Sequence, residues 1–108
     1  MFARTVTMTI KAGRARDLAA TMESEIIPRL WREEGFQDAL ILVAPDGREA
    51  IGLSLWSRRE DADRHGGRAS ERVLQSLSEF LDGAEPARTF QVWNSTFHAI
   101  GARAGIGG

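Results

Sequence analysis

The sequence predicts an α+β fold of the ferredoxin-like type, with elements in the order β-α-β-β-α-β and a four-stranded antiparallel sheet. Three observations predict it: two-residue alternation near the start, helical periodicity over 14–33 and 69–81, and two apolar runs joined by a tight turn. A length of 108 residues favours one domain, which we assign to 1–100. The glycine-rich tail at 101–108 offers little side-chain surface for packing and is expected to be flexible.

The first strand and helix follow from a change of period. Residues 2–10 alternate between apolar and threonine-rich positions, which is typical of a strand. Residues 14–33 repeat apolar side chains at helical spacing. Pro28 predicts an irregular last turn, because proline lacks an N–H and crowds the carbonyl group four residues earlier. Gly35 suits the left-handed position that follows a helix.

The middle of the chain predicts a hairpin followed by a second helix. Residues 36–43 and 49–56 are apolar runs joined by the turn at 44–47, whose proline, aspartate and glycine suit a tight reversal. These features indicate two antiparallel strands. Ser57 and Glu60 have the spacing of a capping box, so a helix is expected to begin there.

The last third of the chain predicts a broken helix and a long final strand. Gly66-Gly67 interrupts the helical pattern, which resumes over 69–81, and residues 88–100 have strand character. Apolar side chains occur on both faces of the later strands, and a sheet that is apolar on both sides must be buried on both sides. The sequence therefore predicts a homodimer that forms through the sheet faces and the last strand.

Composition excludes several classes of protein. The formal net charge of −1, from 14 basic and 15 acidic residues, argues against nucleic acid as a partner. No apolar run approaches the roughly 18 residues of a membrane span, and no secretory pattern opens the chain, so a cytoplasmic location without membrane partners is expected. The absence of cysteine excludes disulfides and thiolate chemistry. Two histidines without paired carboxylates offer no metal site.

Short motifs in the chain resemble the antibiotic biosynthesis monooxygenase family. They are Gly35-Phe36 after a helix that contains Pro28, and Leu55-Trp56-Ser57 followed by Glu60-Asp61. The resemblance covers about 2–98 and implies a dimeric α+β barrel with a pocket between sheet and helices. The family includes cofactor-free oxygenases that act on polyaromatic quinols, haem-degrading enzymes and many small proteins of unknown role.

The resemblance also bears on cofactors. The positions that carry Asn, Trp and His in the haem-degrading branch fall at or near Val6, His65 and Gln75 here, so haem is not expected. The quinol-oxidising branch often places Tyr, Trp and Asn around its substrate, and this chain has Trp and Asn but no Tyr. The predicted reaction uses neither a cofactor nor a metal.

His65 and Asn94 are the candidate catalytic residues. His65 precedes the helix break, where it could act as proton acceptor, because histidine titrates near neutral pH. The alternative is an exposed polar residue beside a loop. Asn94 shares a face of the last strand with His98 and could donate a hydrogen bond to a ligand. Alternatively, both are polar groups of the dimer interface.

Trp31 and Trp56 are the candidate substrate-binding residues. Trp56 could stack on a flat substrate, or it could anchor the core. Trp31 lies near Pro28 and could close the pocket mouth or pack on the sheet.

Two functions fit these residues. One is cofactor-independent monooxygenation of a small aromatic or quinol-type compound, and the other is binding of a small ligand, or a stress-response role, by a dimer without catalysis. A cavity that holds Trp, His and Asn together would favour catalysis. A cavity filled by Met22, Leu74 and Leu77 would favour binding or a structural role.

Overall fold

The computed structural model describes residues 1–66 and 68–97. In chain order its elements are β1 (Phe2–Ile10), α1 (Ala15–Thr21), the π-helix η1 (Met22–Ile26), α2 (Ile27–Leu30), β2 (Phe36–Val43), β3 (Glu49–Trp56), α3 (Arg59–His65), α4 (Arg68–Leu77), the 3-10 turn η2 (Ser78–Phe80), β4 (Leu81–Ala84) and β5 (Arg88–Gln91). This order confirms the predicted α+β, ferredoxin-like fold. None of the helices in the described ranges is both long enough and apolar enough to span a bilayer.

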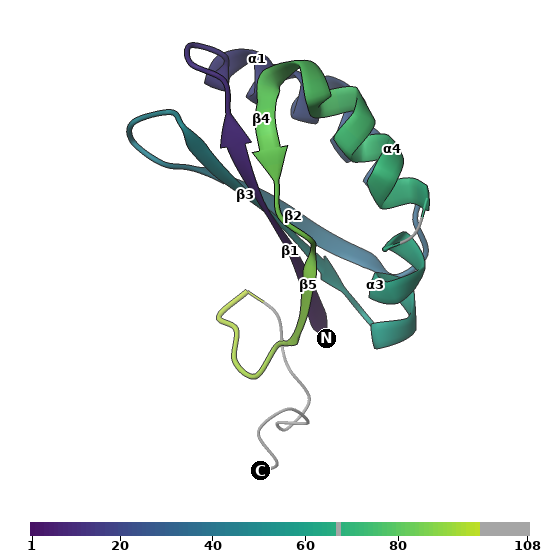
Figure 1. Cartoon of the computed structure of the whole chain (residues 1–108). Helices are drawn as coiled ribbons and strands as arrows, with labels where there is room; N and C mark the ends of the chain where they lie inside the picture. The colour runs from purple at the N-terminus through teal and green to yellow at the C-terminus, as the bar shows by residue number, and fades with distance from the viewer. Residues whose placement is uncertain (67, 98–108) are drawn as a thin grey trace.

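The sheet is antiparallel, and its strands are ordered β2-β3-β1-β4. Strand β5 also pairs with β1, so β4 and β5 share one edge, with β4 beside the end of β1 and β5 beside its start (Figure 1). The prediction of one long last strand over 88–100 is therefore wrong in its bounds. Pro86, which cannot donate a ladder hydrogen bond, lies between the two short strands.

The end of the predicted last strand does not continue the ladder. Gln91 already pairs with Phe2 at the start of β1, and residues 92–97 are not in a strand, although the Val92 N–H donates to the Met1 carbonyl at 2.9 Å. His98 and the predicted flexible tail at 101–108 lie outside the described residues.

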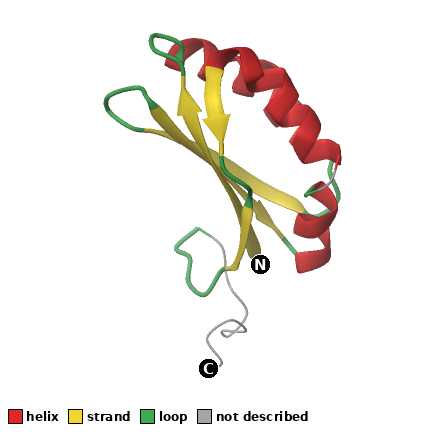
Figure 2. Cartoon of the chain, in the orientation of Figure 1, coloured by secondary structure: helices red, strands yellow, loops and turns green. Residues whose placement is uncertain are grey.

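The helices cover one face of the sheet (Figure 2). Alternate residues of β1 and β3 point toward them, and these meet the apolar stripe of the helices in a single core. The fully buried side chains of this core include Ile10, Leu18, Ile26, Trp56 and Leu77.

The opposite face of the sheet has no helix over it (Figure 2), and we call it the open face. Its apolar residues include Leu40 and Leu42 on β2, Ile51 and Leu55 on β3, and Phe90 on β5, in alternation with the core-facing residues. Strand β1, which lies between β3 and β5, contributes Ala3 and threonines to this face. Leu40 and Leu42 are each 50% exposed and Phe90 is 40% exposed. The predicted two-sided apolar character of the sheet is thus present in the single chain.

The irregularity expected at Pro28 is the π-helical segment that precedes it. The wider turn at 22–26 separates α1 from α2, so the irregularity lies in the middle of the helical run and not in its last turn. Leu18, Met22, Ile26 and Leu30 are all buried at a spacing of four residues. On a regular α-helix such a row drifts by about 40° per step, and the π turn, with its longer hydrogen-bonded ring, reduces this drift.

Two local turn predictions have different outcomes. The hairpin is confirmed: Gly47 has φ +73°, and its N–H donates to the Ala44 carbonyl at 2.8 Å. Gly35 has the expected left-handed φ of +82°. The helix ends earlier, at Leu30, however, so Gly35 lies in the turn before β2 and not directly after the helix.

The predicted capping box is wrong. Helix α3 begins at Arg59 with Arg58 at the N-cap, and no side chain caps it. The Ser57 hydroxyl instead accepts a hydrogen bond from the Gln37 side-chain amide, because Ser57 still lies in the connection that follows β3.

Candidate active site

A cavity of about 70 Å³, the inner cavity, lies between the sheet and the helices. Its wall is almost entirely apolar. Residues of β1, β2 and β3 form one side, and the helical run, His65 of α3 and residues of α4 form the other. The wall includes Val6, Met8, Met22, Ile26, Leu74 and Leu77. A cavity of about 150 Å³ with such a lining can hold benzene, so the inner cavity alone is smaller than an aromatic ring requires.

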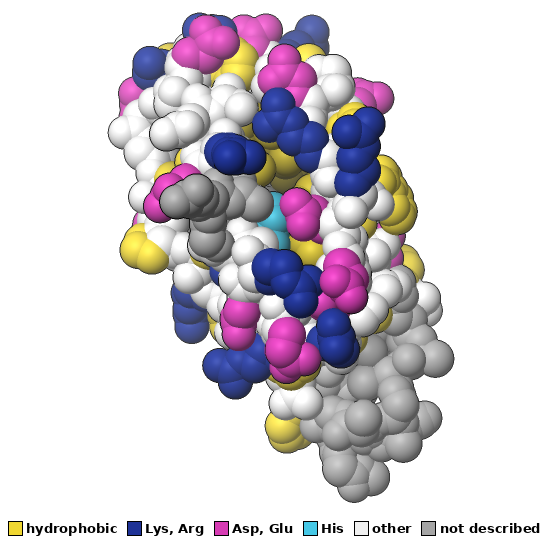
Figure 3. Space-filling view, turned by 90° about the vertical axis from the view of Figure 1, so that its right-hand side faces the viewer, with side chains coloured by type: hydrophobic (Ala, Val, Ile, Leu, Met, Phe, Trp, Pro, Cys, Tyr) yellow, Lys and Arg dark blue, Asp and Glu magenta, His cyan; other side chains and the backbone are white. Residues whose placement is uncertain are grey.

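An outer cavity of about 290 Å³ adjoins the inner one. The two cavities share four lining residues, Ile26, Leu30, His65 and Val73, so they are two parts of one cleft. The outer part adds the charged residues Arg29, Glu33 and Arg72. Figure 3 shows the histidine side chain in a hollow of the surface, with basic and acidic side chains around it. The cleft therefore has a charged mouth and an apolar interior, with His65 between them.

His65 combines partial burial with an unpaired nitrogen. Its ring stacks on Trp56, with ring centroids 5.0 Å apart and an angle of 29° between the planes. Its Nδ1 atom is buried and has no hydrogen-bond partner in the described part of the chain. Burial lowers the pKa of His65, the positive charge of Arg4 lowers it further, and Glu33 acts in the opposite direction. His65 is therefore neutral at pH 7, and a neutral imidazole has one ring nitrogen that can accept a proton.

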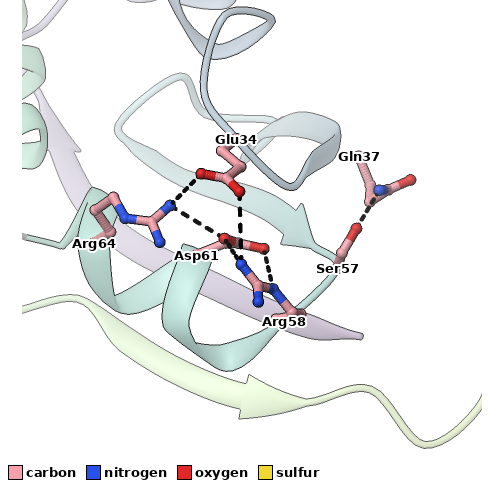
Figure 4. A network of polar contacts seen from close by, with 6 residues as sticks. All are labelled: Glu34, Gln37, Ser57, Arg58, Asp61 and Arg64. Carbon is pink, nitrogen blue, oxygen red and sulfur yellow. Dashed lines mark hydrogen bonds and ion pairs between the residues drawn. The ribbon is translucent and has the colours of Figure 1, made fainter.

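A buried carboxylate, Asp61, lies on α3 one helical turn before His65 and belongs to a network of polar contacts (Figure 4). Asp61 is 2% exposed and accepts hydrogen bonds from Arg58, at 3.2 and 3.3 Å, and from Arg64 at 3.2 Å. Glu34 lies 3.7 Å from Arg58 and 3.4 Å from Arg64, so both arginines connect α3 to the turn before β2. The hydrogen bond from Arg58 is the main reason that the pKa of Asp61 is lowered.

Gly35 completes this junction. A Cβ atom added at Gly35 would lie 2.7 Å from the Asp61 Cβ and still closer to its carboxylate. The Gly35 carbonyl also accepts a hydrogen bond from the Ser57 N–H at 2.8 Å. The Asp61 side chain thus packs directly against the Gly35 backbone, which fixes the start of α3 and with it the direction of His65.

The two candidate tryptophans lie outside the lining of the cleft. Trp56 is fully buried, and its Nε1 donates a hydrogen bond to the Ser54 hydroxyl at 2.8 Å. Its ring stacks against the His65 ring. Trp31 is 63% exposed and meets Phe36 edge-on, with centroids 5.0 Å apart. Phe36 in turn meets Trp56 at 5.5 Å, so Trp31 is connected to His65 only through two other rings.

Asn94 is exposed in the segment that follows β5, and it is absent from the lining of both parts of the cleft. The structure therefore does not bring Asn94 and His65 of one chain together. Met22, Leu74 and Leu77 do line the inner cavity, together with His65. The apolar lining agrees with the expectation for a protein that only binds a ligand, whereas the presence of His65 in the lining agrees with part of the expectation for a catalyst.

Sequence reasoning missed two polar residues of the inner cavity, Arg4 and Ser54. A signal for Arg4 was present, because it shares its strand parity with Val6, Met8 and Ile10, and a charged residue on an apolar strand face is unusual. Ser54 alternates in the same way with Trp56 on β3. In residues 1–66 and 68–97, no three His, Asp or Glu side chains are grouped as metal ligands would be.

Comparison with known proteins shows the fold. No protein-family model matches the chain, and no curated protein does. The monooxygenase ActVA-Orf6 of Streptomyces coelicolor, solved in complex with nanaomycin D, superposes with a TM-score of 0.71 at 15% identity, over 91% of this chain and 92% of that one. SnoaB of Streptomyces nogalater, a cofactor-independent oxygenase, gives 0.70 at 12% identity, over 88% and 95%. A conserved protein from Methanosarcina mazei gives 0.66 at 20%, over 84% and 92%. The fold resemblance to antibiotic biosynthesis monooxygenases is thus confirmed.

The burial of neutral His65 predicts a loss of stability in mild acid. Its pKa is lowered in the folded chain, so below the ordinary histidine pKa of about 6.5 the unfolded chain binds more protons and is favoured. The free energy of unfolding, measured with urea, should therefore decrease as the pH is lowered from 7.5 to 5.5. The decline should be smaller in His65→Phe, and an equal decline in both proteins would contradict the assignment.

The contact between Gly35 and Asp61 predicts that Gly35→Ala destabilises the fold more than Gly13→Ala does. Both glycines have left-handed φ, which costs alanine about 1–2 kcal/mol, but an added Cβ at Gly13 meets nothing within 4 Å. The clash at Gly35 should add about 1–3 kcal/mol. Urea unfolding of the two variants measures this difference, and equal losses would show that Asp61 moves aside freely.

Proposed function

We propose that the chain oxidises a small aromatic or quinol-type compound with O₂, without a metal or flavin, in the cleft beside His65. One observation carries the proposal: a neutral, half-buried imidazole with an unpaired nitrogen lies where the apolar interior meets the charged mouth. The fold shared with a monooxygenase and a cofactor-independent oxygenase supports it. Because the sequence identities are only 15% and 12%, the chemistry must be argued from the residues of this chain.

The reaction needs a base because O₂ reacts readily only with an electron-rich substrate anion. His65 takes a proton from the substrate, and the anion transfers electrons to O₂. At a CH₂ carbon that becomes a carbonyl group, one oxygen atom of O₂ forms the new C=O bond. The other oxygen leaves as water with the two hydrogens of that carbon, so atoms and electrons balance without another reductant.

The other residues have supporting roles in this proposal. Trp56 holds the imidazole ring by stacking, and its own N–H is occupied by Ser54. The apolar wall holds the flat body of the substrate, which must extend from the inner into the outer cavity because the inner cavity is too small. Trp31 and Asn94 of the same chain lie outside the cleft and receive no catalytic role.

Binding without chemistry is the second candidate. It is favoured because Met22, Leu74 and Leu77 form a large part of the wall. It is also favoured because Arg4 and His65 are the only titratable residues in the described lining of the inner cavity. Such a protein would bind the same compounds and consume no O₂.

The open face supports a homodimer as part of the proposal. Its leucines on β2 and β3 and Phe90 on β5 expose apolar surface, and a second copy of the same face would cover it. Trp93, which follows β5, is also exposed, at 59%.

The oxygenase proposal predicts O₂ uptake with members of a quinol and anthrone panel. In His65→Gln and His65→Ala, kcat/KM should fall by about 10²- to 10⁴-fold, since the base is lost. His98→Gln removes the other histidine of the chain and should leave the rate unchanged. An oxygen electrode measures the rates, and near-UV circular dichroism checks folding. Unchanged turnover in His65→Ala would remove the proposed role, and binding without uptake would favour the second candidate.

The dimer proposal predicts that the chain sediments as two copies at micromolar concentration. Leu42→Arg should shift it to one copy, because a charge on the open face cannot be buried at the interface without a partner of opposite charge. Ala20→Arg, at an exposed position on α1, adds the same charge elsewhere and should stay dimeric. Sedimentation velocity distinguishes these results, and a monomeric parent protein would contradict the proposal.

A further inference from the structure

The inner cavity has one polar end, and Arg4 lies there. Arg4 is on the core-facing side of β1, opposite Ser54 in the register with β3. A Cβ atom added at Gly66 would lie 2.7 Å from the Arg4 Nη1, so the guanidinium packs against the residue that follows His65. Arg4, Ser54 and His65 are the polar members of the described cavity lining. The positive charge therefore lies next to the proposed base.

The Arg4 guanidinium makes no ion pair and no hydrogen bond with the residues that the structure describes, in contrast to Arg58 and Arg64 at the other end of α3. Burial lowers the pKa of Arg4, and Asp63 opposes this only through longer-range attraction. An arginine side chain nevertheless stays protonated near neutral pH. A partly buried cation without a partner is costly, and an anion in the cavity would supply the missing partner.

Ser54 adds a second donor at the same end. Its hydroxyl oxygen accepts from the Trp56 Nε1 at 2.8 Å, and its own hydrogen has no acceptor in the described ranges. Residues directly opposite on neighbouring strands have Cβ atoms about 5 Å apart, so Ser54 lies beside the base of the Arg4 side chain, and both residues line the inner cavity. The arginines of the mouth, Arg29 and Arg72, should attract a ligand anion less strongly than Arg4 does, because both are exposed and lie near the negative charge of Glu33.

We propose that the cleft selects ligands in which a flat apolar body carries one oxyanion, and that Arg4 is the residue that selects them. The inference rests on the proposed function only for the location of the ligand. It narrows the ligands to acidic phenols, enols and aromatic carboxylates, of which only the enol form of a compound with an acidic CH₂ group undergoes the oxidation step given above. For a phenol or enol, the proton moves from the substrate to His65, and the negative charge that remains on oxygen faces Arg4 and Ser54. Arg4 then stabilises the anion that reacts with O₂.

A pair of ligands that differ only in charge tests the inference. Calorimetry should show that 2-naphthoate binds at least about tenfold more tightly than the neutral 2-naphthamide, because a charge-assisted hydrogen bond to a partly buried guanidinium is strong. Arg4→Gln should abolish this preference and change the affinity for 2-naphthamide by less than about twofold. Arg4→Lys, which keeps the charge but not the planar donor group, should retain part of the preference.

A further variant serves as a control for the loss of one positive charge. Arg16→Gln removes an exposed cation of α1 that lines neither part of the cleft, and it should keep the preference for 2-naphthoate. Thermal unfolding followed by circular dichroism confirms that Arg4→Gln is folded. Equal binding of the two ligands, binding of neither, or a preference that survives Arg4→Gln would overturn the inference.

The binding measurement is separate from turnover. A preference for 2-naphthoate that Arg4→Gln abolishes would support the anion site even if no quinol supports O₂ uptake, in which case the oxygenase proposal alone fails. O₂ uptake without a preference for the anion would overturn the role of Arg4 and leave the oxygenase proposal standing.

Discussion

A single buried carboxylate determines how the second half of the chain meets the first. Asp61 packs against the backbone of Gly35 and is held by Arg58 and Arg64, which both reach Glu34. Because the two arginines are themselves about half exposed, the cluster pairs the buried charge without burying further cations. Its main effect is geometric: α3 is held at one angle, and one turn later His65 stacks on Trp56 and faces the cleft.

The sheet has two apolar faces with different consequences. The helices cover one face, but between the helical run, α4 and the strands they leave an unfilled space, and this space is the inner cavity. Gly52 widens it, since a residue without a side chain stands there in the middle of β3. The other face has no helix over it and is the surface proposed for dimerisation. The alternation along the strands thus produces both the wall of the inner cavity and the open face.

The order of elements, the hairpin and the helix break could be predicted because each depends on local signals: alternation, a Pro-Asp-Gly turn and paired glycines. The divided last strand depends on pairing with β1, and the sequence of 81–91 alone does not show where that pairing stops and resumes around Pro86. The capping box failed because Ser57 bonds to Gln37, a residue twenty positions earlier. His65 was identified from its chemistry, whereas the separation of Asn94 from it depends on the path of the chain after β5.

Arg4 and His65 influence each other in a way that suits the proposed reaction. Burial is the main reason that the pKa of His65 is lowered, and the neighbouring Arg4 guanidinium lowers it further, so His65 is neutral and able to accept a proton. When the substrate loses that proton, its new negative charge lies against Arg4 and cancels the field that opposed the imidazolium ion. The proton acceptor therefore becomes a stronger base as the anion forms. A ligand without an acidic proton cannot produce this change, so the residue that stabilises the anion also makes proton transfer favourable.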